Sequence, residues 1–405
     1  MTDQRYDVAV AGGGMVGAAL ALALARQEFS VALIEARAPQ REWPQDTYDL
    51  RVSAITRASQ HLLANLGAWS LIAADRSTPY QKMRVWDRAG FGEIQFDAAD
   101  LAEPDLGHIV ENRVIVRALW SVLDEADVAR FCPASIAAQD IEGDVTLRLD
   151  SGERVTASLL VGADGARSRV RDRAGIDLRR EDYEQQAVVA TVHAEQGNQS
   201  TAWQRFMSTG PLALLPMGLD LFSIVWTTTP DEANRLLALD TGSFNAELTT
   251  TSEARLGRLT LVGERAAFPL SLQHANRYVV PGIALVGDAA HVIHPLAGQG
   301  VNLGFLDVGA LVDALVSGRA AGRSPGALRT LRVYERARRG HNTATQMTMD
   351  GFKHLFGSTS PAVALLRNTG LGLAGRIAPL KRRFERVALG HGIELPSLNR
   401  PRFNP

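Results

Sequence analysis

Three closely spaced glycines near the N-terminus are the first residues of this sequence with a clear chemical use. Gly12, Gly14 and Gly17 follow an apolar run over residues 6–11, and an Ala/Leu-rich stretch continues to about Gln27. In a strand–turn–helix unit the first glycine permits the tight turn, the second lets a pyrophosphate approach the backbone, and the third allows close packing of helix on strand. The helix N-terminus offers free N–H groups to phosphates. The pattern predicts a dinucleotide-binding unit.

A carboxylate follows at the distance that this unit requires. Glu35 ends a second apolar strand, residues 30–34, and lies 18 residues after Gly17. There a carboxylate can accept hydrogen bonds from the ribose hydroxyls, and its charge disfavours a 2′-phosphate. The sequence therefore predicts FAD or NAD rather than NADP at this site. A second glycine pattern, residues 370–375, is interpreted as accidental because no apolar strand precedes it.

Two later turns each follow a short apolar strand. Asp164 comes after the run at residues 158–161, and the pair Gly287-Asp288 comes after another run of the same kind. Taken singly, each is a turn before a helix, which many proteins contain. Their order along the chain, after the glycine unit, makes them informative together.

This set of motifs resembles the group A flavoprotein monooxygenases, the p-hydroxybenzoate hydroxylase superfamily, from residue 5 to about residue 345. The resemblance implies FAD as the resident cofactor. It also implies that the Asp164 segment serves both FAD and the nicotinamide cofactor, and that Asp288 binds ribityl or ribose hydroxyls. Because only one dinucleotide fold is predicted, NADH or NADPH is expected to bind transiently near the flavin.

Further cofactor contacts are implied by the same resemblance. Arg51 matches the arginine that reaches the FAD phosphates, and Asn112 stands where an amide side chain contacts the cofactor. A glycine-rich loop that opens a helix would place backbone donors against the pyrimidine edge of an anionic reduced flavin. The loop residues expected beside the isoalloxazine ring are Gly298, Gly300, Val301 and Asn302, and the expected substrate contacts are Pro295 and Phe206.

Several segments narrow the resemblance to the bacterial ubiquinone-biosynthesis hydroxylases, and within them to the demethoxyubiquinol hydroxylase branch. This implies a monooxygenase that uses NAD(P)H and molecular oxygen to hydroxylate a prenylated phenol or quinol. No catalytic side chain is assigned, because the flavin supplies the chemistry and no acid–base constellation stands out. The segments are residues 111–114, 203–206, 210–216, 268–270 and 294–304, joined for the branch by 96–99 and 380–383.

The elements that position these residues indicate an α/β fold. A Rossmann-like FAD-binding domain of the p-hydroxybenzoate hydroxylase type is expected, with C-terminal helices and an antiparallel-sheet substrate domain over the flavin. Apolar strands predicted at residues 187–192, 213–215 and 222–227 suit a water-insoluble ring. The expected FAD-binding parts are 1–75, 106–180 and 276–345, the substrate-domain parts are 76–105 and 181–275, and the C-terminal helical region is 346–405.

Composition excludes several other classes. The 43 Lys and Arg nearly cancel 44 Asp and Glu, so no broad positive field would attract nucleic acid. The single cysteine, Cys132, cannot form an internal disulfide, and a reducing, cytoplasmic location is expected, with peripheral contact at the inner membrane left open. His291 and His294 lack a third ligand, so no metal is expected. The uncharged stretch at residues 8–25 is interpreted as strand, turn and helix rather than a membrane span.

Other interpretations remain open. A sister ubiquinone hydroxylase could act at another ring position, since a few pocket residues could switch between them. An FAD-dependent isoprenoid reductase or epoxidase shares the nucleotide unit, and a non-enzymatic scaffold in a lipid-synthesis assembly or a homo-oligomer is also compatible. An FAD halogenase is disfavoured because the sequence has no Trp-x-Trp pair. Residues 380–389 predict a basic amphipathic helix, which either caps the domain or rests on anionic lipid.

Overall fold

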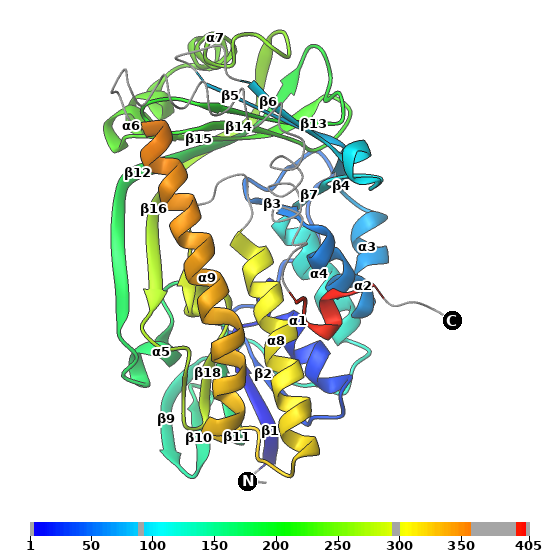
Figure 1. The fold of residues 1–405 in the computed structure, drawn as a ribbon, viewed down its shortest axis with the longest axis vertical. Helices are drawn as coiled ribbons and strands as arrows, with labels where there is room; N and C mark the ends of the chain where they lie inside the picture. Colours follow the sequence, from blue (N-terminus) through cyan, green and yellow to red (C-terminus); the bar gives the residue numbers. More distant parts are fainter. Residues whose placement is uncertain (1–3, 88–92, 294–299, 358–393, 402–405) are drawn as a thin grey trace.

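The computed structural model describes residues 4–87, 93–293, 300–357 and 394–401. Two eight-stranded sheets dominate these residues, one near the N-terminus and one at the opposite end of the molecule (Figure 1). A three-stranded sheet, β3-β7-β4, lies between them. It consists of β3 (Val52–Ile55), β4 (Ser77–Tyr80) and β7 (Gly107–Glu111).

The first large sheet, named here the core sheet, has the order β17-β18-β11-β1-β2-β8, with β10 and β9 added beside β11. Five of its strands run parallel, and residues with fully buried side chains make up its centre. This explains their near-continuous apolar sequences, because a parallel sheet is covered on both faces. Its strands are β1 (Gln4–Ala11), β2 (Val31–Ile34), β8 (Ala129–Phe131), β9 (Ile136–Glu142), β10 (Asp144–Leu149), β11 (Arg154–Gly162), β17 (Val279–Val280) and β18 (Ile283–Leu285).

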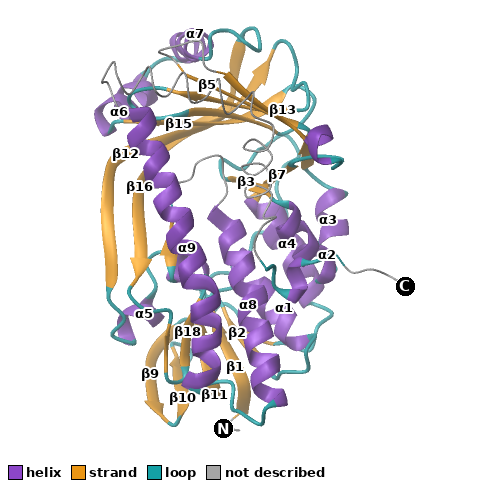
Figure 2. Ribbon diagram, in the orientation of Figure 1, coloured by secondary structure: helices purple, strands orange, loops and turns teal. Residues whose placement is uncertain are grey.

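Helices pack beside the core sheet (Figure 2). Helix α1 (Met15–Ala25) is buried along most of its length and contacts both α4 and α8, which explains its apolar composition on every side. The uncharged stretch at residues 8–25 therefore forms strand, turn and buried helix, as predicted. The other helices here are α2 (Arg57–Asn65), α3 (Trp69–Ala73), α4 (Asn112–Leu123), α5 (Arg169–Arg173), α8 (Gly300–Ala320) and α9 (Leu328–Gly357).

Among the described residues, α8 is the one helix with the length and hydropathy of a membrane span, and it is mostly buried within the protein. The segment after the undescribed residues 358–393 returns to the same region. Asn65 of α2 donates to the carbonyl oxygen of Leu398 over 2.8 Å, and Asn399 is fully buried. The predicted helix at residues 380–389 and the glycine pattern at 370–375 lie outside the described residues.

The second large sheet, named the roof sheet, has the order β19-β16-β12-β15-β14-β13-β5-β6. It is antiparallel as predicted, except that β13 and β5 run parallel because β5 reaches the sheet from an earlier part of the chain. Strands β12 and β16, each 17 residues long, extend along one side of the molecule (Figure 1). The strands are β5 (Lys82–Asp87), β6 (Glu93–Asp97), β12 (Leu178–Ala194), β13 (Thr201–Phe206), β14 (Leu212–Pro216), β15 (Leu221–Thr228), β16 (Leu259–Ala275) and β19 (His291–Val292).

The two faces of the roof sheet pack against different parts of the molecule. The outer face carries bulky residues, among them Leu214, Ile224 and Trp226, and is covered by α6 (Pro230–Ala238) and α7 (Thr241–Thr251). The inner face, toward the three-stranded sheet, carries alanines at positions 187, 202, 213 and 266. Larger apolar residues such as Val189 and Leu215 lie on the same face, so this face is apolar. The division of the chain into the six predicted segments stays a prediction.

Candidate functional site

The glycine turn after β1 has the geometry that the sequence predicts. Gly12 has a φ of +103°, and a Cβ atom there would overlap the carbonyl oxygen of Ala163. A Cβ atom at Gly17 would overlap the carbonyl oxygen of Gly12, so any larger residue would push α1 away from the turn. A Cβ atom at Gly14, by contrast, would meet nothing within 4 Å, which leaves the N-terminus of α1 accessible.

Glu35 stands at the end of β2 beside this turn. Its carboxylate accepts hydrogen bonds from the backbone N–H of Gly13 at 2.5 Å and of Arg37 at 2.9 Å. The indole N–H of Trp120 fixes the turn from the other side by donating to the carbonyl oxygen of Gly13 at 2.7 Å. The carboxylate is thus oriented by backbone groups, and its proposed contact with a ribose uses its remaining acceptor positions.

The glycine turn and the Asp164 segment line one cavity of about 490 Å³. Its walls combine the start of α1, the end of β2 and several arginines. The sequence had not identified these arginines as site residues. Such a cavity offers backbone N–H groups and guanidinium groups to phosphates, and a carboxylate to a ribose, so it fits the ADP half of a dinucleotide. The residues that line it include Gly12, Gly14, Glu35, Asp164, Gly165, Arg167, Arg169 and Arg173.

Asp164 has a local role that its motif did not reveal. One carboxylate oxygen accepts the N–H groups of Arg169 at 2.8 Å and Val170 at 3.1 Å, while the other accepts the hydroxyl of Ser168. These bonds satisfy free donors at the start of α5. Asp164 therefore holds the arginine-bearing segment at the cavity wall, and its direct contact with a cofactor stays a prediction.

The structure brings Asp288 and Arg51 together, although more than two hundred residues separate them. Gly287 has a φ of +57°, which favours glycine at this turn. The Asp288 side chain is solvent-accessible but lies deep in the molecule, and desolvation raises the pKa of its carboxyl, against the opposing charges of His291 and Arg51. An accessible carboxyl surrounded by protein is suited to accept hydrogen bonds from ligand hydroxyls.

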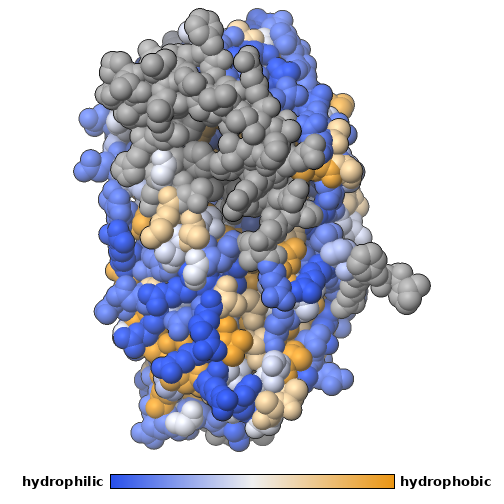
Figure 3. Space-filling view, in the orientation of Figure 1, coloured by the Kyte–Doolittle hydropathy of each residue, from blue (hydrophilic) through white to orange (hydrophobic). Residues whose placement is uncertain are grey.

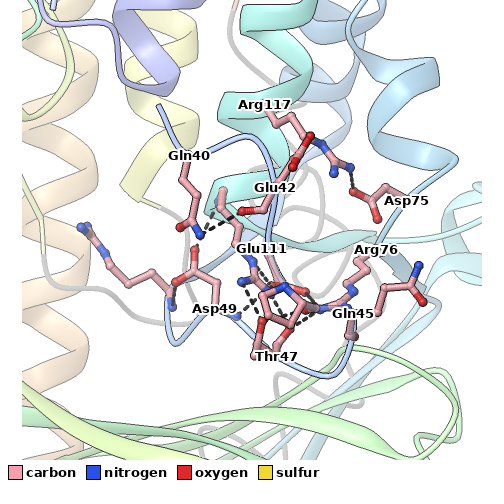
Figure 4. A network of polar contacts seen from close by, with 12 residues as sticks. Gln40, Glu42, Gln45, Thr47, Asp49, Asp75, Arg76, Glu111 and Arg117 are labelled. Atoms are coloured by element: carbon pink, nitrogen blue, oxygen red, sulfur yellow. Dashed lines mark hydrogen bonds and ion pairs between the residues drawn. The ribbon is translucent and has the colours of Figure 1, made fainter. Parts of the chain in front are cut away.

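A network of arginines and carboxylates holds the segment that leads into Arg51 (Figure 4). Glu111, whose side chain is 1% exposed, accepts the N–H of Asp49 at 2.7 Å, Arg113 Nε at 2.7 Å and Arg76 at 3.1 Å. Because Asn112 N–H donates to the carbonyl oxygen of Arg51 at 3.0 Å, this network fixes the backbone of Arg51 relative to α4. The sequence contained no signal for it beyond a high density of charges.

Asn112 and Asn302, both expected to contact the cofactor, make protein contacts in the structure. Asn112 accepts the hydroxyl of Ser53 at 2.7 Å. Asn302 is 6% exposed and joins α8 to β3 by accepting the N–H of Thr56 at 3.0 Å and donating to the carbonyl oxygen of Ala54 at 2.8 Å. Their contacts with a cofactor remain predictions, and for Asn302 the backbone is the group left to make them.

The remaining predicted site residues divide into two groups. Gly300 and Val301 form the start of α8, and Phe206 is buried at the end of β13 on the same face as Ala202. Pro295, Gly298 and His294 lie outside the described residues. Within the described residues no group of three His, Cys, Asp or Glu side chains is arranged to hold a metal ion.

Comparison with known proteins identifies what this arrangement resembles. The model of the FAD binding domain family matches residues 5–349. The 3-demethoxyubiquinol 3-hydroxylase of Escherichia coli K12 is 41% identical over 392 residues, covering 96% of this chain and 100% of that protein. Ubiquinone hydroxylase UbiL of Rhodospirillum rubrum is also 41% identical, over 404 residues, covering 98% of this chain and 93% of that protein.

The fold also matches a solved structure. The crystal structure of PqsL, a probable FAD-dependent monooxygenase from Pseudomonas aeruginosa, superposes with a TM-score of 0.76 at 23% identity, covering 91% of this chain and 100% of that one. At this identity the match supports the fold, with its Rossmann-like part, its second sheet and its C-terminal helices.

Proposed function

The chain belongs to the FAD binding domain family and is an FAD-dependent monooxygenase, and we propose that it hydroxylates the ring of a prenylated phenol or quinol in ubiquinone biosynthesis. The observation that carries the proposal is 41% identity to a 3-demethoxyubiquinol 3-hydroxylase across nearly the full length of both chains. Because UbiL is equally identical, the sister reaction at another ring position is the second candidate.

The cofactor is FAD, and bound FAD supplies the electron transfer and oxygen activation. We propose that the N-terminus of α1, from Gly12 to Gly17, binds its diphosphate and that Glu35 binds the adenosine ribose. Asp288 would accept hydrogen bonds from ribityl or ribose hydroxyls, and Arg51, which lies near it, would neutralise phosphate charge. The backbone N–H groups at Gly300 and Val301, at the positive end of α8, would stabilise negative charge on the flavin.

The reductant is proposed to be NADH or NADPH, which would bind transiently near the flavin. The substrate ring is proposed to lie between FAD and the inner face of the roof sheet. The alanines and larger apolar residues on that face, together with the half-exposed Phe268 of β16, make this surface apolar, which suits a prenylated ring. The protein's work is to hold that ring in place and exclude water.

The proposed cellular setting follows from the same substrate. The enzyme would act in the cytoplasm and collect its water-insoluble substrate from the inner membrane or from neighbouring pathway enzymes. A homo-oligomer or a ubiquinone-biosynthesis assembly stays a prediction.

The test uses the FAD-loaded protein with a demethoxyubiquinol analogue that has a short prenyl chain, NADH or NADPH, and ¹⁸O-labelled oxygen. We expect one labelled oxygen atom in the product ring, and the ring position distinguishes the two hydroxylase candidates. A product reduced or epoxidised on its prenyl chain would favour the isoprenoid enzyme instead. If the analogue does not stimulate nicotinamide oxidation and no product forms, the proposed hydroxylation is wrong. That result would favour a non-enzymatic scaffold in a lipid-synthesis assembly.

A further inference from the structure

Helix α8 carries a carboxylate in the interior of the protein. Asp307 has no exposed surface, and the residues around it on α8 are buried as well. Burying an ionised carboxylate is costly unless donors and an opposite charge surround it. The contacts that compensate this cost show what the carboxylate does.

Both oxygens of Asp307 bind groups from other parts of the chain. Oδ2 accepts the backbone N–H of Gly287 at 3.0 Å and lies 2.6 Å from Nε2 of His291. Oδ1 accepts Nε of Arg338, from α9, at 2.8 Å. Gly287 and His291 stand on either side of Asp288, so a single carboxylate holds both ends of the turn that presents Asp288.

Electrostatics keep this carboxylate ionised at neutral pH. Desolvation by itself would raise the pKa of Asp307, but His291 and Arg338 outweigh it and lower the pKa to about 2. Arg338 is also almost fully buried, so the pair is shielded from solvent and salt. The hydrogen bonds to the turn are therefore made by a permanently charged acceptor, which makes them stronger than bonds to a neutral one.

Close packing of α8 also restricts movement of the turn, in addition to these hydrogen bonds. Gly304 precedes Asp307 by one helical turn, and a Cβ atom there would lie 2.6 Å from Val16 of α1 and 3.3 Å from the Cα atom of Gly287. Helix α8 thus touches the backbone of the turn directly, which is why a side chain as short as aspartate can reach the N–H of Gly287.

The same cluster extends to the roof sheet. Arg338 donates to Asn342 at 2.8 Å, Asn342 donates to the hydroxyl of Tyr278 at 3.3 Å, and that hydroxyl lies 3.0 Å from Nε2 of His274. His274 belongs to β16, and it pairs with His291 in β19. The turn that presents Asp288 therefore continues directly into the edge of the roof sheet, and Asp307 lies at this junction.

We propose that Asp307, together with Arg338, is a positioning residue that fixes the Asp288 turn relative to the roof sheet and so sets the place of FAD relative to the substrate. Its effect on FAD binding rests on the proposed contact of Asp288 with FAD, and its effect on hydroxylation rests on the proposed function. In Asp307→Asn the shape is kept, but the amide N–H₂ must face either the donors of the turn or the guanidinium of Arg338. One of these contacts is lost and the turn loosens.

The test compares Asp307→Asn with Tyr334→Phe. Tyr334 lies on the inward face of α9 and donates a buried hydrogen bond at 2.7 Å to the carbonyl oxygen of Leu285, which precedes the turn, rather than to Gly287 or His291. We expect Asp307→Asn to raise the FAD dissociation constant at least tenfold, shift the flavin absorption spectrum, and lower the yield of hydroxylated product per nicotinamide oxidised. Tyr334→Phe should lower the thermal midpoint with the dissociation constant, spectrum and yield unchanged.

A second variant covers the case in which Asp307→Asn fails to fold. His291→Gln keeps the Asp307–Arg338 pair and weakens only the contact at the end of the turn, so the same changes are expected in smaller measure. If the folded variants lose stability with wild-type FAD binding and spectrum, the residue is merely structural and the proposal is wrong. The FAD measurements need no substrate, so they distinguish this failure from a failure of the proposed hydroxylation.

Discussion

Asp288 and Arg51 bring opposite charges to one place in the structure, and the Asp288 carboxyl is accessible to a ligand although desolvation raises its pKa. Asp288→Ala should therefore remove a charge-assisted hydrogen bond to FAD without disturbing the fold. The expected loss is about 1.5–3 kcal/mol, or roughly one to two decades in the dissociation constant. Fluorescence titration with FAD measures it. Asp231→Ala, at an exposed position in α6, is the control, and equal affinities in the two variants would contradict the role given to Asp288.

A histidine on α9 makes stability depend on pH. Desolvation and the nearby charge of Arg338 lower the pKa of His341 from its ordinary value of 6.5 to about 4. The folded protein therefore favours the neutral ring, so the stabilisation is complete above pH 6.5 and is lost as the pH falls toward 4. We expect the wild-type unfolding midpoint to fall between pH 7.5 and pH 5, and His341→Gln to show a smaller fall.

The control for this prediction is the exposed Met347 of α9, whose substitution by leucine removes no titratable group and should leave the pH dependence as in the wild type. Parallel curves for the wild type and His341→Gln would mean that other groups account for the acid sensitivity.

Individual site residues could be predicted from the sequence where the local backbone geometry requires one residue type. Gly12 and Gly17 could be predicted because backbone contacts within a single strand–turn–helix unit exclude any side chain. Asp307 and Arg338 could not, since they are 31 residues apart on two helices and look like ordinary surface charges until packing brings them together. Asp164 was expected to contact the cofactor, which stays a prediction, and the motif gave no sign of its bonds at the start of α5.

Helix α9 shows why periodicity alone misjudges an element. Its inward positions are Leu331, Tyr334, Arg338 and Asn342, so polar residues continue a stripe that begins as apolar. Figure 3 shows a largely hydrophilic surface over the lower part of this helix. The exposed arginines there are Arg329, Arg332, Arg336 and Arg339. A sequence pattern would place all five arginines outside, whereas the structure places one of them against a buried carboxylate.

Strands were predictable in position but not in length or partner. The apolar run at residues 187–192 lies within β12, which the structure extends to 17 residues, and β5 pairs in parallel with a strand more than one hundred residues later. Pairing of this kind depends on long-range contacts that no local pattern encodes.

Two glycines on neighbouring helices allow a matched prediction about packing. Gly304→Ala places a Cβ atom 2.6 Å from Val16, so α8 must shift away from α1 and the Asp288 turn, at a cost of about 1–3 kcal/mol. FAD affinity should fall with it. Gly340→Ala, at an exposed position of α9 with nothing within 4 Å, should stabilise the helix by about 0.5–1 kcal/mol with unchanged FAD affinity. Denaturant unfolding and FAD titration of both variants test this, and a stabilised Gly304→Ala would contradict the packing argument.

At the scale of the whole molecule, the proposed FAD contacts come from segments far apart in the chain. The glycine turn belongs to the start of the core sheet, Arg51 leads into the three-stranded sheet, and the Asp288 turn continues into β19 of the roof sheet. A ligand that contacts all three sheets stabilises their packed arrangement, because part of its binding free energy is lost when the sheets separate. FAD should therefore stabilise the roof sheet as well as the sheet that binds its diphosphate.

This argument gives a prediction that hydrogen exchange can resolve by segment. Binding at one hundred times the dissociation constant contributes about 2.7 kcal/mol to the stability of any unit that must open for FAD to leave. We expect FAD to slow amide exchange in β1 and α1 and, to a similar degree, in β16 and β19, although the last two lie on the roof sheet. Strand β6, at its far edge, should change least. If FAD protects only the core sheet, the two sheets open independently, and the junction at Asp307 does not couple them.

In Asp307→Asn the protection of β16 and β19 should decrease at saturating FAD while that of β1 persists, because the variant keeps the diphosphate site and loosens only the turn that joins it to the roof sheet.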